Sequence, residues 1–295
     1  MIRKKFFIPV FIILSLLLLN GFAQAEKSFL WKIETAKGNS YLLGSVHVLK
    51  KELYPLRPII EDAFTQTDLL AVEADMSSEK MGQAAMLVLT KGSYQGEETL
   101  KDNLSEKTYL LLESKLKEMG LSIEGFIKYK PWMVASVMLQ QSLAKLGFDP
   151  TNGIDFHFLN KAVEAKKPIF ELEGIEYQLN LFNSFSKEEM EKFLLSSIVE
   201  SDQSPQMFEQ LVDTWQKGDV GHMEKLLTEN ISQYPDLNNF YEKLIDVRNK
   251  NMSEKIDKLL KEGKKVMVVV GAAHMVGKEG IVQLLINKGY KVSQL

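Results

Sequence analysis

The stretch that decides the fold of this chain is VMVVVGAAH, residues 266–274. An apolar run of valines and one methionine is the strongest strand signal in the sequence, and Gly271, two alanines and His274 follow it. A second stretch, YLLGSVH at residues 41–47, repeats the pattern of an apolar run, a glycine, two small or apolar residues and a histidine. The chain has four histidines, and two of them stand in this G-x-x-H frame. Two strand ends that each carry a histidine predict one shared site.

Four further strand-like runs accompany these two. Residues 29–34 and 41–46 are separated by a short Lys-Gly-Asn turn and predict a hairpin. Residues 68–73 and 168–173 are short apolar runs that each end in an acid, and residues 290–292 predict a closing strand. These runs are spread along the chain, so the sheet must be assembled from distant segments.

Helical patterns fill the intervals between the strands. They cover residues 58–64, 152–165, 240–262 and 277–287, each opened or closed by Pro or Gly. Strands that alternate with helices predict an α/β fold with a central mixed sheet flanked by helices. The mainly helical signals of residues 77–146 predict an insertion or cap over that sheet.

The first 25 residues have the pattern of a secretory signal peptide. Residues 3–5 are basic, residues 6–19 are apolar, and AQA at residues 23–25 is a small-x-small cleavage site. Cleavage would leave residues 26–295 as a single exported domain, periplasmic or extracellular. The alternative is an uncleaved membrane anchor, because the apolar run is fairly long. No other stretch approaches the ~20 apolar residues of a spanning helix, so no stable membrane span is expected after cleavage.

The composition narrows the possible partners and the metal chemistry. Lys and Arg number 36 against 39 Asp and Glu and are scattered, so nucleic acid is not an expected partner. The chain has no Cys, which excludes disulfides, a cysteine nucleophile and thiolate metal sites. It also lacks H-E-x-x-H and G-x-S-x-G, so neither an ordinary zincin nor a serine nucleophile elbow is expected. Any metal must be held by His, carboxylate or water.

Polar side chains follow the predicted strands at their carboxyl ends: His47, Glu73, Glu173 and His274. Ligands of α/β sheets bind at these ends, so we expect the four side chains to form one site. Imidazole is the commonest metal ligand in proteins, and nearby carboxylates complete the ligand set or orient the rings. The sequence therefore predicts a divalent metal site that favours Zn, Mn, Co or Fe. A lone G-x-x-H would instead favour a non-functional interpretation, in which the glycine ends a strand and the histidine lies in a loop.

The remaining candidates have competing interpretations. Gly44 and Gly271 are expected to allow a tight turn after each strand, where a side chain would clash. Asp155 either supports the site or caps the helix that follows it. His157 and His222 lie in helical stretches and are expected to be structural or exposed.

The two G-x-x-H elements together resemble the TraB/GumN family, which includes the Tiki metalloproteases. The family's hallmark is two G-x-x-H motifs plus a Glu and an Arg, which correspond here to His47, His274, Glu73 and Arg248. On residue type alone Arg248 would be interpreted as a solvated surface charge. The resemblance covers nearly the whole mature chain and includes LWKI at 30–33, VEAD at 72–75, GID at 153–155, LE at 172–173 with Gln178, W-x-x-G-D at 215–219, Arg248-Asn249 and GYKV at 289–292.

The resemblance implies metal-dependent peptide cleavage, the activity of Tiki proteins, with manganese or cobalt favoured. Bacterial relatives are linked to inhibition of peptide pheromones, and many have no defined activity. This chain lacks the C-terminal membrane segment found in some relatives, which argues against a membrane-tethered role.

We therefore expect an exported metal-dependent hydrolase, a peptidase, that acts on a peptide or small-molecule substrate. His47 and His274 would bind the metal, and Glu73 would be a third ligand or the base. Arg248 would stabilise an oxyanion or hold a substrate carboxylate. Two alternatives stay open: a non-catalytic protein that captures an exported peptide, and a metal-dependent hydrolase of another bond, such as an ester. The residues expected to support the ligands or contact substrate are Gly44, Gly271, Asp155 and Glu173.

Overall fold

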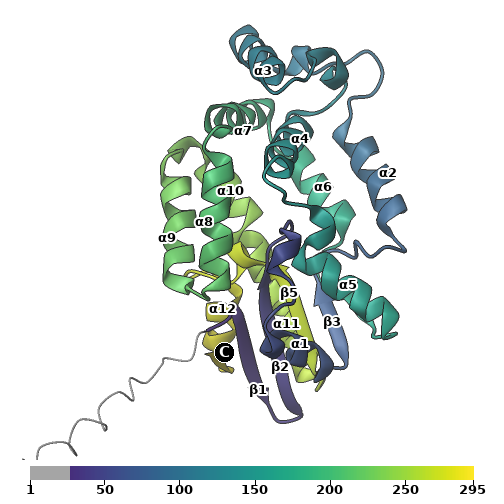
Figure 1. The fold of residues 1–295 in the computed structure, drawn as a ribbon, viewed down its shortest axis with the longest axis vertical. Coiled ribbons are helices and arrows are strands. Elements are labelled where there is room, and N and C mark those ends of the chain that lie inside the picture. The colour runs from purple at the N-terminus through teal and green to yellow at the C-terminus, as the bar shows by residue number, and fades with distance from the viewer. Residues whose placement is uncertain (1–26) are drawn as a thin grey trace, which may run out of the picture.

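Six strands form one mixed sheet in residues 27–295, the part of the chain that this computed structural model describes. The strand order is β4-β3-β5-β2-β1-β6 (Figure 1). Every strand-like run predicted above is a strand, so the α/β class with a central mixed sheet is confirmed. The expected signal peptide, residues 1–25, lies outside the described residues. The strands are β1 Leu30–Thr35, β2 Gly38–Ser45, β3 Leu69–Val72, β4 Ile169–Glu171, β5 Val266–Gly271 and β6 Lys291–Gln294.

Strands β4, β3, β5 and β2 are parallel neighbours, whereas β1 runs antiparallel to both β2 and β6. All residues of β5 are buried between β3 and β2, as expected for an apolar strand covered on both faces. The parallel register places Ser45 of β2 opposite Gly271 of β5, and Val72 of β3 opposite Val269. The carboxyl ends of four strands therefore meet at one edge of the sheet.

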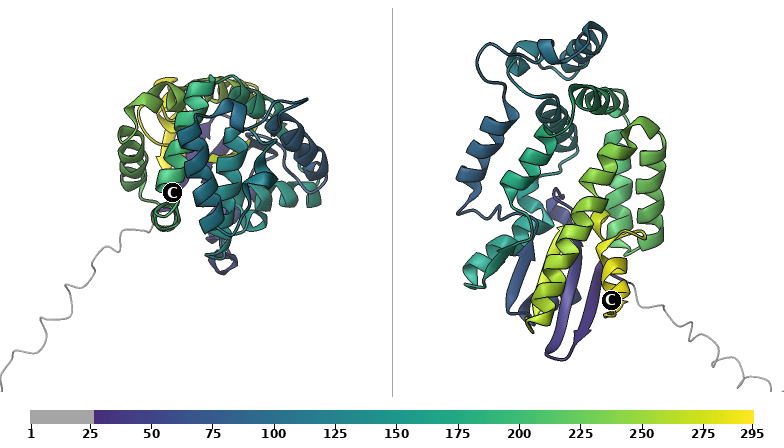
Figure 2. Two further views of the ribbon diagram at one scale, coloured as in Figure 1. Left: turned by 90° about the horizontal axis from the view of Figure 1, so that it is seen from above. Right: turned by 180° about the vertical axis from the view of Figure 1, so that it is seen from behind.

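Helices cover both faces of the sheet and form a further layer beyond its carboxyl edge (Figures 1 and 2). Helix α11 crosses the face nearest the viewer in the right-hand panel of Figure 2, and α1 lies on the other face. No helix within residues 27–295 is both long and apolar enough to cross a membrane. The helices are α1 Pro58–Thr65, α2 Met81–Gly92, α3 Glu106–Glu118, α4 Pro131–Ala144, α5 Ile154–Glu164, α6 Ile175–Asn183, α7 Lys187–Glu200, α8 Ser204–Gln216, α9 Val220–Ser232, α10 Asn238–Leu244, α11 Asp246–Lys261 and α12 Ile281–Asn287.

The helical layer is built from two separate parts of the chain. Residues 77–146 supply α2, α3 and α4, so the predicted helical character of this segment is confirmed. Its side chains share buried clusters with the later helices: Leu112 of α3 lies in one cluster with Leu194 of α7. Trp132 of α4 stacks on Phe182 of α6, with 5.4 Å between the ring centroids. The segment therefore packs as part of a larger helical layer, and its status as an insertion within a single domain stays a prediction.

Two helices are shorter than predicted. The helix expected over residues 240–262 is two helices, α10 and α11, which meet at Ile245 with φ −119° and ψ −67°. The helix expected over residues 277–287 begins only at Ile281, because Gly277 has φ +82° and Gly280, the N-cap, is extended with φ −70° and ψ 150°. Apolar periodicity runs across the break at Ile245, so the pattern alone does not reveal it. Residues 277–280 are GKEG, with no apolar side chain, so the predicted helix extends there without apolar periodicity.

Candidate functional site

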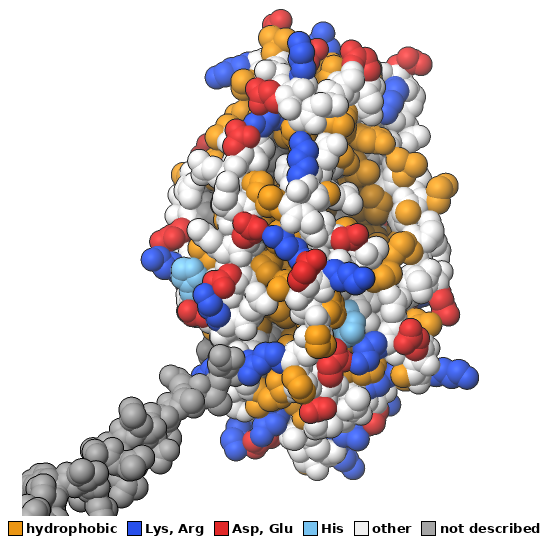
Figure 3. All heavy atoms as spheres, in the orientation of Figure 1, with side chains coloured by type: hydrophobic (Ala, Val, Ile, Leu, Met, Phe, Trp, Pro, Cys, Tyr) orange, Lys and Arg blue, Asp and Glu red, His pale blue; other side chains and the backbone are white. Residues whose placement is uncertain are grey.

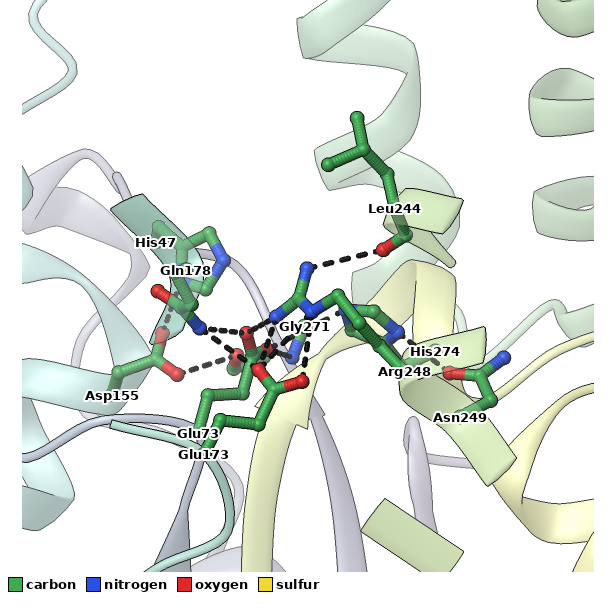
Figure 4. A network of polar contacts seen from close by, with 11 residues as sticks. His47, Glu73, Asp155, Glu173, Gln178, Leu244, Arg248, Asn249, Gly271 and His274 are labelled. Carbon is green, nitrogen blue, oxygen red and sulfur yellow. Dashed lines mark hydrogen bonds and ion pairs between the residues drawn. The ribbon is translucent and has the colours of Figure 1, made fainter. Parts of the chain in front are cut away.

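The two G-x-x-H motifs end side by side, because β2 and β5 are parallel neighbours. Their pairing runs as far as Ser45 and Gly271. His47 follows two residues after Ser45, and His274 closes the 3-10 turn η6, Ala272–His274, directly after β5. Figure 4 shows the two rings on either side of a cluster of carboxylates at the carboxyl edge of the sheet.

A tight turn follows one of the two motif glycines: Gly271 is the N-cap of the 3-10 turn η6, whereas Gly44 lies inside β2. Gly271 has φ −50°, and Gly44 is not among the described glycines with positive φ. The reason for glycine is space. A Cβ on Gly44 would lie 2.5 Å from Phe29 Cδ1, and one on Gly271 would lie 3.4 Å from both His47 Nε2 and Glu73 Oε1. The clash predicted for a side chain is confirmed at Gly44, the predicted turn is present after Gly271 but not at Gly44, and both glycines leave room for neighbouring groups.

Asp155 holds the ring of His47. Its Oδ2 lies 2.8 Å from His47 Nδ1, and its Oδ1 accepts a hydrogen bond from Ser45 Oγ at 2.8 Å. Helix α5 can approach this closely because Gly153 has no side chain: a Cβ there would lie 2.2 Å from the carbonyl oxygen of His47. The N-cap of α5 is Gly153, with no side-chain cap bond, so the alternative interpretation of Asp155 as a helix cap is wrong.

The ring of His47 is the accessible histidine of the pair. Its side chain is 66% exposed. The negative charge of Asp155 raises the pKa of His47, because it favours the protonated ring. With Nδ1 held by Asp155, Nε2 is the free ring atom, and it is the atom that faces Gly271.

His274 is buried and is held by Asn249. Its Nδ1 lies 2.6 Å from Asn249 Oδ1, and the amide of Asn249 is oriented by donating from Nδ2 to the carbonyl of Glu279 at 2.9 Å. Burial lowers the pKa of His274 to about 4, so the ring is neutral near pH 7. Because Asn249 presents an acceptor oxygen, the proton of the neutral ring resides on Nδ1. The lone pair of Nε2 is therefore left for the site.

Glu73 is the centre of the polar network. Its Oε1 accepts from the Gly271 N–H at 2.7 Å, and its Oε2 accepts from Gln178 Nε2 at 3.0 Å and from Arg248 Nη2 at 2.5 Å. Burial alone would raise the pKa of Glu73, but the neighbouring histidines, Arg248 and the Gly271 N–H hold it well below its usual value. Glu73 is thus a carboxylate at neutral pH, with Oε1 lying 3.8 Å from His274 Nε2.

The guanidinium of Arg248 donates hydrogen bonds to two acidic side chains, Glu73 and Glu173. Its side chain is 11% exposed, so its interpretation as a solvated surface charge is wrong. Nε and Nη2 donate to the carboxylate of Glu173 at 2.7–3.1 Å, and Nη2 also donates to Glu73. Nη1 donates to the carbonyl of Leu244 at 3.1 Å, at the end of α10. Charge-assisted, forked bonds of this kind fix geometry, so Arg248 sets where the two carboxylates lie.

Two members of this network are absent from the predicted set of site residues: Asn249 and Gln178. Both lie on helices, α11 and α6, so no strand end marks them in the sequence. The one signal for them is that both belong to the segments that resemble the family. The remaining histidines lie away from the network: His157 contacts Glu61, and His222 is exposed at the start of α9.

Within residues 27–295, no group of three or more His, Asp or Glu side chains is arranged as a finished metal-ligand set. The donor chemistry nevertheless fits a divalent ion. Both rings have Nδ1 held by a hydrogen-bond partner, the usual arrangement for histidines that bind metal through Nε2. Two ligand atoms about 2.1 Å from one ion are roughly 3 to 3.5 Å apart, so the 3.8 Å between His274 and Glu73 needs only a small adjustment.

The space at Gly271 is common to these donors. A Cβ on Gly271 would lie 3.4 Å from His47 Nε2, 3.4 Å from Glu73 Oε1 and 3.6 Å from His274 Cδ2. A side chain there would fill the gap between the two rings and the carboxylate. Residues His47, His274 and Glu73 therefore converge on one small, side-chain-free space.

The profile of the TraB/PrgY/gumN family matches residues 29–294. The chain belongs to this family. The match spans the sheet, both G-x-x-H motifs and the helical layer, so the site described above lies wholly inside the matched region.

Two curated relatives have matching sequences. One is the uncharacterised protein YbaP of Shigella flexneri, 32% identical over 147 residues, which are 49% of this chain and 53% of the relative. The other is YbaP of Escherichia coli K12, 31% identical over the same length and shares. The chain thus spans about half the length of the curated relatives it matches. No solved structure matches this chain.

Proposed function

We propose that this protein is an exported metal-dependent hydrolase that cleaves peptides. The observation that carries the proposal is that His47 Nε2 and Glu73 Oε1 meet at the space beside Gly271, with His274 Nε2 3.8 Å from Glu73 Oε1 and both Nδ1 atoms already held. Membership of the TraB/PrgY/gumN family supports it, because the family's hallmark residues are the ones that converge.

His47 and His274 would hold the ion, which is Mn, Co or Zn. A bound divalent metal would lower the pKa of a water ligand toward neutrality and so supply a nucleophile. Asp155 and Asn249 hold the Nδ1 atoms of the two rings, which would leave Nε2 of each ring to bind the ion. The two histidines reach the site from different strands, so neither strand can form the site alone.

Glu73 has two possible roles, and they differ in a measurable way. As a third ligand it would bind through Oε1, the oxygen that faces His274 at 3.8 Å. As a base it would take a proton from water through the same atom. Oε2 is engaged by Arg248 and Gln178, which keep Oε1 turned toward the histidines. Arg248 therefore acts on the position of Glu73, and its bonds to Glu73, Glu173 and Leu244 leave one N–H of Nη1, which would stabilise an oxyanion or hold a substrate carboxylate.

The first test is bound metal, measured by mass spectrometry on mature protein loaded with Mn, Co or Zn and then desalted. We expect about one ion per chain in the wild type and in His222→Ala, whose exposed histidine lies outside the network. His47→Ala and His274→Ala should each lose the ion. A wild-type protein that folds but retains none of the three metals would contradict the proposal.

The second test separates the reaction types. Metal-loaded protein is incubated with a panel of peptides and with esters of matched sequence, and products are identified by mass spectrometry. Catalytic peptide cleavage supports the proposal, whereas ester cleavage alone would favour the other hydrolase. Loss of one peptide per protein without product would favour a capturing protein. Glu73→Gln should lose metal if Glu73 is a ligand, or keep metal and lose cleavage if it is the base.

Export is tested separately. The full chain is expressed in a Gram-negative host, and the N-terminus of the protein from the cell envelope and medium is sequenced. A mature N-terminus at Glu26 is the expected result. Retention of Met1 on membrane-bound protein would show that residues 1–25 act as an anchor.

A further inference from the structure

A cavity of about 450 Å³ opens directly beside the proposed metal site. His47, Glu73, Asp155 and Gln178 contribute its polar wall. Its size falls in the range of small-ligand pockets, roughly 300 to 1,000 Å³. Any group bound in it would lie against the residues proposed to carry out hydrolysis.

The rest of the cavity wall is mostly apolar and comes from the helices α2, α5 and α6, the 3-10 turn Pro150–Asn152 and the loop after β3. Phe156, which follows Asp155 directly, and Leu159, one helical turn further along, line it from α5. Met81 begins α2, and Ile175 begins α6, beside Gln178. In Figure 3 the molecule is hollowed on the side that carries α2, and hydrophobic side chains gather along the hollow. The complete apolar part of the lining is Ala74, Met76, Met81, Pro150, Phe156, Leu159 and Ile175.

Both carboxylates in the cavity wall already have hydrogen-bond partners, and this affects which groups the cavity can bind. Glu73 is bonded to Arg248 and Gln178, and Asp155 is bonded to Ser45 and His47. Apart from Nε2 of His47, the wall offers a charged group no free partner, so a charged group that entered the apolar part of the cavity would lose its water without replacing those bonds, and that is costly. An apolar group would gain from leaving water.

We propose that this cavity binds a large apolar side chain of the peptide substrate and so places the neighbouring peptide bond at the histidines. This inference rests on the proposed function only in calling the bound peptide a substrate. The preference of the cavity for an apolar side chain does not require catalysis. Met76 and Met81 are flexible and polarisable, so the cavity adapts to several apolar shapes. We therefore expect a preference for Leu, Met and Phe as a class over Lys and Glu.

The test is equilibrium binding without turnover. Fluorescein-labelled peptides Gly-Gly-Xaa-Gly-Gly, with Leu, Met, Phe, Lys or Glu at Xaa, are titrated with mature protein in chelator and followed by fluorescence anisotropy. The three apolar peptides should bind at least about tenfold more tightly than the two charged ones. Equal affinities, or no measurable binding of any of the peptides, would overturn the proposal. Because no metal or cleavage is involved, failure of the hydrolase proposal would leave this result interpretable.

Met81→Glu and Met86→Glu make a matched pair for locating the binding. Both residues are on α2, and their side chains are solvent-accessible at 39% and 65%, so neither change buries a charge in a packed core. Met81 lines the cavity and Met86 does not. Met81→Glu should abolish the preference for apolar peptides, whereas Met86→Glu should keep it. Identical effects of the two changes, with both proteins folded by circular dichroism, would place the binding elsewhere and overturn the proposal.

Discussion

Each histidine of the site is held at Nδ1 by a different kind of partner. His47 faces the carboxylate of Asp155, which stabilises a positive ring and raises its pKa. His274 faces the neutral amide of Asn249 in a buried position, which keeps the ring uncharged. Two histidines in similar motifs thus differ in charge state because their neighbours differ. For His274 the identity of residue 249 decides which nitrogen carries the proton.

We predict that Asn249→Leu reduces metal affinity roughly 10- to 100-fold, because the partner that orients a metal-binding histidine contributes about this much. The readout is isothermal titration of mature protein with the metal that it retains. In the metal-free wild type, nitrogen NMR should show His274 Nε2 without a proton, and the variant should lose this preference.

Asn239→Leu is the control for Asn249→Leu. Asn239 is exposed and donates to Glu189 far from the network, so its replacement should leave affinity unchanged. Wild-type affinity in a folded Asn249→Leu protein would refute the role given to the amide.

At the scale of the elements, the site depends on how closely α5 and α11 approach the strand ends. Helix α5 carries Asp155, and α11 carries Arg248 and Asn249. The approach of α5 is set by Gly153 and by the bond from Ile154 N to the carbonyl of Val46 at 3.0 Å. Asp155, Arg248 and Asn249 can therefore contact the site only because close backbone packing brings their helices to the strand ends.

Gly153→Ala tests this close approach. A Cβ would lie 2.2 Å from the carbonyl oxygen of His47, so α5 must shift, and we expect a loss of about 1–3 kcal/mol in the free energy of unfolding. Urea unfolding measures it. Gly82→Ala, in α2 with nothing within 4 Å, should instead gain about 0.5–1 kcal/mol, since alanine favours a helix over glycine. Equal stabilities for the two variants would argue against tight packing at Gly153.

Helix α11 is also tied to the far end of the chain through Asp257. Its carboxylate accepts from Lys261 Nζ at 2.8 Å and from Tyr290 Oη at 2.7 Å. Burial would raise the pKa of Asp257, but these two bonds lower it overall. A lowered pKa means that the carboxylate stabilises the fold above its unfolded pKa, about 4, and that this stability is lost as the pH falls through the folded value.

Asp257→Asn should therefore cost about 1–3 kcal/mol at pH 7, and the difference from wild type should shrink below about pH 4. Urea unfolding of both proteins across this range is the measurement. Glu254 lies on the same helix as Asp257 and forms an exposed ion pair with Lys288, which follows α12. Glu254→Gln breaks this pair and should change stability by less than about 1 kcal/mol. A difference that stays constant down to pH 2 would contradict the assignment.

At the scale of the whole molecule, the helical layer is one packed body made from distant segments. Phe240 of α10 contacts Phe185 and Phe193, with 4.3 Å and 4.8 Å between ring centroids, and lies in one buried cluster with Trp132 of α4. A cluster shared in this way couples residues 77–146 to the helices that follow α5. The wall of the cavity beside the histidines depends on that coupling, since α2 and α6 belong to the same layer.

Phe240→Ala should destabilise the protein by about 3–5 kcal/mol, the usual cost of removing a buried aromatic ring. Its effect should spread, so hydrogen exchange should accelerate in α4 although that helix is far away in sequence. Val199→Ala, at a 65% exposed position of α7, should change stability by no more than about 0.5 kcal/mol. Faster exchange confined to α10 would show that the layer is not one cooperative unit.

The sequence by itself determined the strands and therefore where the chain delivers its histidines and acids. Apolar runs of this length and the residues that end them are local features, so residues 41–47 and 266–274 could be recognised without any structure. The parallel sheet then accounts for why His47, Glu73, Glu173 and His274 lie at one edge.

Only the tertiary structure decided the partners of those side chains. Asp155, Arg248, Asn249 and Gln178 come from helices, and no local pattern states which turn of a helix will face a strand end. The same holds for Gly44 and Gly271, where the need for glycine arises from neighbours remote in sequence rather than from backbone dihedrals. Hydrogen bonds and close packing act over a few ångströms in space, and it is the folding of the sheet and helices that brings these residues within that distance.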